Sequence, residues 1–291
     1  SAPTLQDALR NVVIDSPRQL YAAQLELIIL SEEAATNHMP EILEYFSREP
    51  ESRTEVKFVI ARGDDSTKAV TIQTLLTNFS SSNIKQSLEL QQKVLGLTSV
   101  YTLNELLNMY LDPTLEISLP SIIVYGNAEE GDKKENITTS TPKALTKIGT
   151  TAIFKGKDFL GYLTEEESKV HSIIIGSTNE GIITLDYKDN YSVFELYKIE
   201  SDISPDIKDN KITLNISGKT RIKEFHSNTN ITKSKETDRL NKELNKHIED
   251  IIKKNFNSMR EKYNTDIFSF RQSFYRGNPK YYNTHYKDTW Y

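Results

Sequence analysis

The stretch GIITLDYKDNYSVFELYKI, residues 181–199, decides the fold of the C-terminal half of the chain. It holds two runs rich in β-branched and aromatic residues, GIITLDY and YSVFELYKI, which are separated by turn-forming residues. This pattern predicts a β-hairpin. The Asp residues of the connection lack the ring of ligands and the terminal Glu of a calcium loop, so they indicate a turn.

A third strand and a long helix follow this hairpin. The segment KITLNISGKTRIKEF, residues 211–225, predicts a strand, and the segment from about Thr237 to Tyr263 predicts a helix with one apolar stripe. The stripe consists of Leu240, Leu244, Ile248, Ile251, Ile252, Phe256 and Met259. The fold class expected is therefore α+β, with a C-terminal antiparallel sheet packed against a long C-terminal helix.

The last segment, FSFRQSFYRGNPKYYNTHYKDTWY (residues 268–291), mixes aromatic and basic side chains. We expect the helix to continue to about Arg276, because Ile267, Phe270 and Phe274 extend the apolar stripe at three- and four-residue steps. Full burial of each such ring stabilises the fold by about 1.5 to 3 kcal/mol. The sequence Gly-Asn-Pro at 277–279 then predicts the end of the helix.

Two functions fit this composition. Aromatic rings among Lys and Arg stack bases and neutralise phosphates, and they also anchor a helix and contact a protein partner. The formal net charge of the chain is −5, although 13 Lys and Arg residues stand against 8 Asp and Glu residues from Lys233 onward. The acidic total favours core packing plus docking. A nucleic-acid- or anion-binding protein that uses the basic, aromatic C-terminal segment is the alternative.

The length of 291 residues suits two or three domains, with 26% charged and 37% apolar residues. We predict three small domains: a first α/β domain over 1–62, a middle mainly helical domain with a linker over 63–143, and a C-terminal α+β domain over 144–291. The polar linker is expected at 127–143. The chain has no cysteine, which excludes disulfides and thiolate metal sites.

The first domain is predicted to lack strands of its own sheet. Helix and strand alternate within its 62 residues, but its two strands, QLELIILS (24–31) and RTEVKFVIAR (53–62), are too few for a stable sheet. The chain also opens on SAPTLQDALRNV, which predicts a helix, without an initiator Met. We therefore expect the missing strands upstream of Ser1, in a processed or truncated chain.

Motifs for chemistry are absent from the sequence. The five histidines are scattered, and no two of them have the spacing of metal ligands. The carboxylates of TEEES (164–168) are consecutive, so they point in different directions, and Thr164 with Glu167 predicts a capping box. We predict no enzyme activity, no catalytic residue, no cofactor and no metal.

Two blocks in this order resemble a known family. The first is TTAIFKGKDFLGYLTEEES (150–168), and the second is DIFSFRQSFYRGNPKYY (266–282). Both blocks are similar to blocks of the C subunit of bacterial spore germinant receptors. Two further stretches also fit the pattern of that family: SPRQLYAAQLELIILSEEAA (16–35) and EYFSREPESR (44–53). Gln24 and Ser269 depart from the pattern of that family.

The resemblance implies a function. It implies a non-enzymatic lipoprotein subunit of a germinant receptor on the outer face of the spore inner membrane, held by an N-terminal lipid outside this chain. It implies a transporter-like subunit and a second membrane subunit as partners, and nutrient-triggered spore germination as the process. No nucleic acid or metal is expected as a partner.

A subunit that acts by binding needs exposed contact residues. Three places combine exposure with unusual composition: the hairpin tip Lys155–Asp158, the helix exit Arg48–Arg53 and the tail Arg276–Trp290. Each is equally well explained as a solvated turn or terminus. The tail is favoured because it pairs aromatic with basic groups, and replacing its three tyrosines with Ser is expected to leave the melting temperature nearly unchanged. The candidates are Arg48, Arg53, Lys155, Lys157, Arg276, Lys280, Tyr281, Tyr282, Tyr286 and Trp290.

Overall fold

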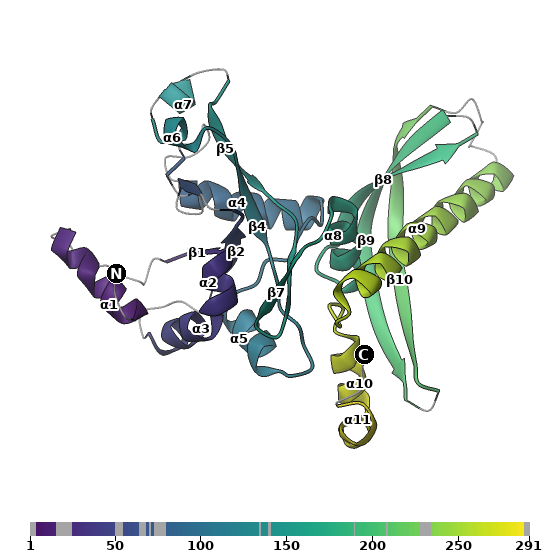
Figure 1. Ribbon diagram of the computed structural model, residues 1–291. Coiled ribbons are helices and arrows are strands. Elements are labelled where there is room, and N and C mark those ends of the chain that lie inside the picture. Colours follow the sequence, from purple (N-terminus) through teal and green to yellow (C-terminus); the bar gives the residue numbers. More distant parts are fainter. Residues whose placement is uncertain are drawn as a thin grey trace. The chain divides into compact units, whose positions relative to one another are not determined.

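The computed structural model (Figure 1) describes residues 4–15, 25–49, 55–63, 68–69, 71–72, 80–133, 135–138, 141–188, 190–207, 209–226 and 234–287. The chain forms two compact units. Unit 1 comprises Ser1–Glu89 with Val100–Tyr162, and unit 2 comprises Leu90–Ser99 with Leu163–Tyr291. The division into three domains at 62/63 and 143/144 stays a prediction, and the sheet of unit 1 takes strands from all three of those parts.

The main sheet of unit 1 has four strands in the order β1-β2-β4-β5. Strands β1, β2 and β4 are parallel, and β5 is antiparallel to β4. The bounds are β1 Leu27–Ser31, β2 Lys57–Ala61, β4 Ser121–Gly126 and β5 Ala144–Ile148. We expected the missing partners upstream of Ser1; in the structure β2 pairs on one side with β1 and on the other with β4, which lies far downstream in the sequence.

Both faces of this sheet are covered. Phe58 and Ile60 of β2 pack in a core that includes Leu43 and Leu106, while Val59 of β2 points to the opposite face. A strand that is buried on both faces needs a continuous apolar run, as β2 has. The helices of unit 1 are α1 Leu5–Asp15, α2 Glu32–Asn37, α3 Met39–Arg48, α5 Leu103–Leu111, α6 Ala128–Gly131 and α7 Glu135–Thr138, and α4 Ser80–Val94 crosses its boundary.

The predicted linker at 127–143 is more ordered than expected. It contains α6 and α7, and the side chain of Asn136 is buried. The amide of Asn136 donates to the carbonyl of Ala144 at 3.0 Å, and its oxygen accepts from the backbone N–H groups of Lys143 and Ala144. A buried amide that is satisfied in this way fixes the segment against the start of β5.

A second, three-stranded sheet of unit 1 holds the first block of the family resemblance. Its order is β3-β6-β7, all antiparallel, with β3 Ser118–Leu119, β6 Ala152–Lys155 and β7 Asp158–Tyr162. Ala152, Ile153 and Phe154 are buried. The apolar residues of the block therefore build the core, and the hairpin predicted at Lys155–Asp158 is confirmed by the pairing of these two residues.

Unit 2 is a three-stranded antiparallel sheet with a long helix against it, as predicted (Figure 1). The strand order is β10-β9-β8, so β10 is an edge strand of this sheet. Leu185, Tyr187 and Phe194 of the sheet pack against Leu240 and Leu244 of the helix. The bounds are α8 Glu165–Ile174, β8 Glu180–Tyr187, β9 Asn190–Asp206, β10 Lys211–Phe225 and α9 Ser234–Tyr263.

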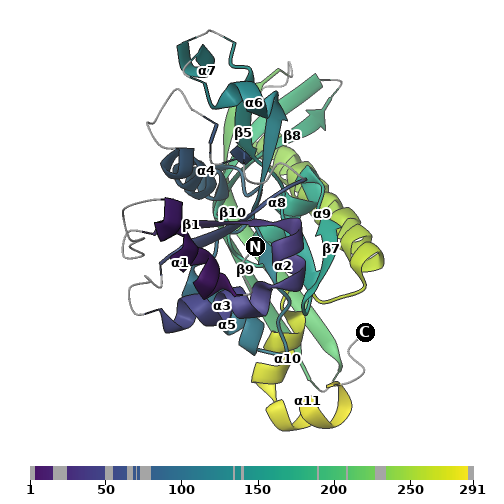
Figure 2. The same cartoon turned by 60° about the vertical axis from the view of Figure 1, so that its left-hand side comes forward.

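The C-terminal helix does not continue to Arg276. Helix α9 ends at Tyr263, and the next residue, Asn264, has a left-handed backbone with φ 45°. Such a residue ends a helix, and Asn tolerates it better than most residues do. Two shorter helices follow, α10 Phe270–Gly277 and α11 Pro279–His285 (Figure 2). The prediction of one continuous helix is therefore wrong, because the sequence DIF folds as a turn.

Candidate partner-interface surfaces and an uncovered groove

The hairpin tip of unit 1 is exposed, as the sequence analysis expected. Lys155, Gly156, Lys157 and Asp158 are all exposed, and Gly156 has a left-handed φ of 58°. The N–H of Gly156 donates to a carboxylate oxygen of Glu116 at 2.8 Å, which holds the turn in place. The tip therefore presents two lysines on a fixed loop.

The C-terminal end of α3 has fewer features of an interface than the hairpin tip has. Arg48 makes an ion pair with Glu44 at 2.6 Å, one helical turn earlier, and both side chains are mostly exposed. Such an exposed pair contributes about 0.2 to 1 kcal/mol at most. Arg53 lies outside the described residues. Up to Glu49, where the described residues of this surface end, it has no further feature that distinguishes it from an ordinary solvated helix.

The tail proves to be a small packed cluster. Arg276 and Lys280 are exposed, Tyr281 and Tyr286 are half-buried, and Tyr282 is 3% exposed. The expectation of an exposed ring at Tyr282 is therefore wrong, because the short helices α10 and α11 pack against each other and enclose it. Trp290 lies outside the described residues.

Ring contacts hold this tail together. Tyr275 and Tyr282 meet edge to face at 5.5 Å between centroids, and Phe274 and Tyr286 do so at 5.3 Å. Tyr281 stacks on the imidazole of His285 at 4.2 Å. These contacts join α10 to α11, so the triple Ser substitution expected to spare the melting temperature removes part of a core.

The second block of the family resemblance forms the junction between α9 and α10. The buried carboxylate of Asp266 accepts hydrogen bonds from the backbone N–H groups of Phe268, Phe270 and Arg271. It therefore takes the role of an N-cap for α10, whose own N-cap residue, Ser269, makes no side-chain cap bond. Burial raises the pKa of Asp266, and the three amide donors oppose that rise.

A buried histidine ties this junction to α8. The Nε2–H of His171 donates to the carbonyl of Ile267 at 2.8 Å, and the ring of Phe268 lies 5.9 Å away. Within the described part of the chain, the Nδ1 atom of His171 has no hydrogen-bond partner. Burial lowers the pKa of His171 to about 4, so its imidazole is neutral near pH 7.

Unit 1 contains a polar network around Arg62. Its Nε–H donates to Ser121 at 2.9 Å, its Nη2–H donates to Thr150, and its guanidinium lies 3.6 Å from the ring centre of Tyr162. The hydroxyl of Tyr162 donates to Glu32 at 2.6 Å, and burial raises the pKa of Tyr162 above its ordinary value. Each polar group thus has a structural partner, and the network joins β2, β4 and β7.

No metal centre is visible in the described ranges. Among those residues, no group of three or more His, Asp or Glu side chains could hold a metal ion. In the same part of the chain, no helix combines the length and the apolar character that a membrane span requires.

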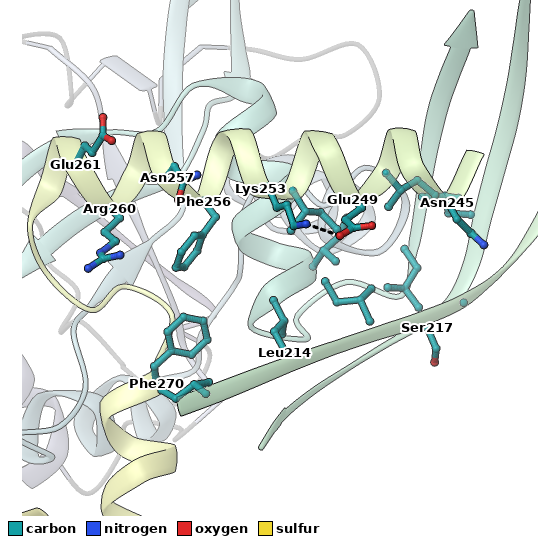
Figure 3. Close-up of a pocket in the computed structure, with 18 of the residues that line it drawn as sticks. Leu214, Ser217, Asn245, Glu249, Lys253, Phe256, Asn257, Arg260, Glu261 and Phe270 are labelled. Atoms are coloured by element: carbon teal, nitrogen blue, oxygen red, sulfur yellow. Dashed lines mark hydrogen bonds and ion pairs between the residues drawn. The ribbon is translucent and has the colours of Figure 1, made fainter. Parts of the chain in front are cut away.

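Unit 2 has a groove that sequence reasoning missed (Figure 3). It has a volume of about 1410 Å³ and runs between α9 on one side and β9 and β10 on the other. Its apolar lining includes Leu196, Ile199, Ile212, Leu214, Ile216, Ile248, Ile252, Phe256, Phe270 and Phe274. The sequence predicted a strand at KITLNISGKTRIKEF and a long helix packed against the sheet, but nothing in it showed that this helix leaves part of the strand open.

The middle of that stripe is where the groove opens. Leu244 is 2% exposed and Met259 is 0% exposed, whereas Ile248, Ile252 and Phe256 between them stay half-buried. The first part of α9 packs on β8 and β9. Helix α10 packs on β9, so the apolar face of β10 remains accessible from the groove.

The comparisons with known proteins cover both units. Residues 149–291 match the family model described as "Spore germination B3/ GerAC like, C-terminal", and residues 1–124 match "Spore germination protein N-terminal domain". The chain is 22% identical over 292 residues to spore germination protein KC of Bacillus subtilis (strain 168), covering 98% of this chain and 71% of that protein. It is 23% identical over 287 residues to spore germination protein B3 of the same organism, covering 96% of this chain and 72% of that protein.

A solved structure has the same fold. The crystal structure of the GerBC protein superposes with a TM-score of 0.59 at 19% sequence identity, covering 96% of this chain and 78% of that chain. The likeness extends over both units, as the family models do. The chain therefore belongs to the spore germination B3/GerAC-like family, the C subunits of spore germinant receptors, and has a role in spore germination.

Proposed function

We propose that the chain is a non-enzymatic lipoprotein subunit of a germinant receptor complex. In this proposal an N-terminal lipid outside this chain anchors it to the outer face of the spore inner membrane. It acts there with a transporter-like membrane subunit and a second membrane subunit in nutrient-triggered germination. The observation that carries the proposal is the family match to residues 1–124 and 149–291, which spans nearly the whole chain.

Action by binding, without chemistry, is supported by the partners of the perturbed side chains. The largest pKa shifts belong to His171 and Tyr162, and each of these groups is engaged by a neighbour inside its own unit. A catalytic acid or base instead needs to reach a proton of the substrate. Both groups are therefore best explained as parts of the fold.

Contacts with the other subunits are proposed for exposed basic groups. Lys155 and Lys157 at the hairpin tip, and Arg276 and Lys280 beside the half-buried ring of Tyr281, are accessible in their units. Arg and Tyr are enriched at protein interfaces, because they combine apolar area with directed hydrogen bonds. The tail remains the favoured surface of the two.

The test is co-purification from spores. The full-length, lipidated protein carries an affinity tag in its sporulating host, and the membrane subunits are identified in the detergent extract by mass spectrometry. We expect the transporter-like subunit and the second membrane subunit to be retained, and the double variant Arg276→Glu, Lys280→Glu to lose them. Lys246→Glu, an exposed charge reversal on α9, is the matched control and should retain both. Extracts in which no membrane subunit accompanies the wild-type protein would refute the proposal.

The same preparation also tests the alternative function, in which the protein binds nucleic acid. Binding of double-stranded DNA that weakens steeply between about 50 and 200 mM salt would indicate phosphate contacts. We expect no such binding from a protein with a formal net charge of −5.

A further inference from the structure

We propose that the groove between α9 and the β9–β10 strands binds an acidic amphipathic helix of a protein partner. This inference rests on the proposed function, in that a subunit without chemistry acts through its binding surfaces. It concerns a surface distinct from the exposed basic groups described above, and it states the chemistry of the occupant.

The floor of the groove is an apolar row that the described residues leave partly open. Ile212, Leu214 and Ile216 alternate along β10 on the groove side and are half-buried. Leu196 and Ile199 of β9 continue this floor. An accessible apolar surface of this kind at the edge of a sheet marks a site of interaction, because water is expelled when a partner covers it.

The spacing of the α9 side chains in the wall of the groove matches the spacing of side chains on an incoming helix. Ile248, Ile252 and Phe256 lie four residues apart on α9. They therefore form one ridge, in which neighbouring side chains are about 6 Å apart. Alternate residues on β10 are about 7 Å apart. Side chains at positions i and i+4 of an incoming helix have nearly the same spacing as both rows, so they can interdigitate with floor and wall together.

The size of the groove favours a peptide segment over a small molecule. Sites for small ligands enclose roughly 300–1,000 Å³, and they bury most of the ligand. This groove has a volume of about 1410 Å³, which is above that range. A helix has the diameter and length to cover it, and a single small molecule would leave most of the floor wet.

The charges at the groove select an acidic occupant. Lys219 of β10 and Arg260 of α9 line the groove from its two sides, and neither forms an ion pair within the described part of the chain. Lys253 makes an ion pair with Glu249, and the carboxylate of Glu261 points away from the groove (Figure 3). Two cations thus face the space above an apolar floor, and Asp or Glu flanking the apolar row of a helix would pair with them.

A photo-crosslinker identifies the occupant in place. The full-length protein carries p-benzoylphenylalanine at Asn245, which is exposed and lines the groove, and is irradiated in sporulating cells of its host. The control position is Thr213, which is exposed on β10 but does not line the groove. We expect one crosslinked peptide at Asn245, absent at Thr213, whose sequence has apolar residues at i, i+3, i+4 and i+7 flanked by Asp or Glu.

The affinity of that mapped peptide then tests the charge argument. We expect Lys219→Glu with Arg260→Glu to weaken binding at least tenfold in fluorescence anisotropy. The matched control, Lys211→Glu with Lys246→Glu, makes the same charge change outside the groove lining and should leave the affinity unchanged. Thermal melts of the wild-type protein and of both double variants show that folded proteins are compared.

Four results would overturn the proposal: crosslinks to lipid, crosslinks to a second copy of this chain, no crosslink above the control, or a basic or irregular mapped segment. Equal weakening by both double variants would overturn the charge argument and with it the acidic helix. Retention of the membrane subunits in the co-purification, despite any of these results, would leave the proposed function intact. Loss of those subunits together with the expected crosslink would refute the proposed receptor complex but leave the proposal about the groove standing.

Discussion

Protonation of His171 should destabilise unit 2 as the pH falls from neutral to acidic. The imidazole is 0% exposed, and its Nε2–H is used by the carbonyl of Ile267. A second proton must therefore go to Nδ1, which has no hydrogen-bond partner among the described residues. The positive charge would then lie beside the ring of Phe268, without water to solvate it.

The size of the effect follows from proton linkage. Burial lowers the pKa of His171 from 6.5 to about 4 in the folded chain. The unfolded state thus binds more protons than the folded state between these two values, so the free energy of unfolding decreases as the pH falls through this window. At about 1.4 kcal/mol per pKa unit, the full loss below pH 4 is about 3 kcal/mol, of which about 2 kcal/mol is already lost at pH 5.

The assay compares wild type with His171→Gln by urea unfolding at pH 7 and pH 5, followed by circular dichroism. The Gln side chain keeps a donor for Ile267 but has no titratable group. We expect the wild-type protein to lose about 2 kcal/mol more than the variant between the two pH values. Carboxylates that titrate in this range affect both proteins equally, so the difference isolates His171.

His38→Gln is the matched control, because His38 is exposed. It should show the pH dependence of the wild-type protein. Equal losses for wild type and His171→Gln would refute the reasoning, because they would mean that His171 is neutral or charged to the same extent in both states. A variant that is already unfolded at pH 7 is replaced by His171→Asn in the same comparison.

Further substitutions test the junction, the tail and the capping box. Asp266→Ala leaves three backbone amides at the start of α10 without their acceptor, so we expect a loss of about 3 kcal/mol in urea unfolding, and a loss below about 1 kcal/mol would contradict the capping role. Tyr282→Ala should cost about 3 kcal/mol because the ring is 3% exposed, whereas Tyr281→Ala on the half-buried neighbour should cost about 1 kcal/mol; equal melting temperatures would show that Tyr282 is not part of the core. Thr164→Ala removes the hydroxyl that accepts from the N–H of Glu167, and we expect a loss of about 1 kcal/mol by thermal melting, with an unchanged midpoint counting against the capping box.

Features that depend on a few neighbouring residues could be predicted from the sequence. The capping box of Thr164 and Glu167 is confirmed with both of its hydrogen bonds, since they join residues three apart. The turn between Lys155 and Asp158 is confirmed for the same reason. The three strands and the long helix of unit 2 follow from periods of two and 3.6 residues, which the sequence displays directly. The family resemblance rests on these blocks, and the comparisons bear it out.

Features that depend on distant residues could not be predicted in this way. One partner strand of β2, β4, lies in sequence beyond α4 and α5, and nothing in β2 itself says which later strand completes its sheet. The end of helix α9 at Tyr263 was not predicted either. The apolar spacing that includes Ile267 and Phe274 is the same whether the backbone turns after Tyr263 or continues as a helix. The burial of Tyr282 depends on that turn.

The sequence by itself determined the type and approximate bounds of most elements of unit 2, the α+β class and the family. The tertiary structure alone decided how completely the apolar rows of α9 and β10 are covered. An apolar period shows that one face of a helix or strand avoids water, but the extent of burial is set by what packs on that face. The chain turns after Asn264, and helix α10 packs on β9 instead of continuing α9 as expected. Ile252 and Leu214 therefore remain at an open groove.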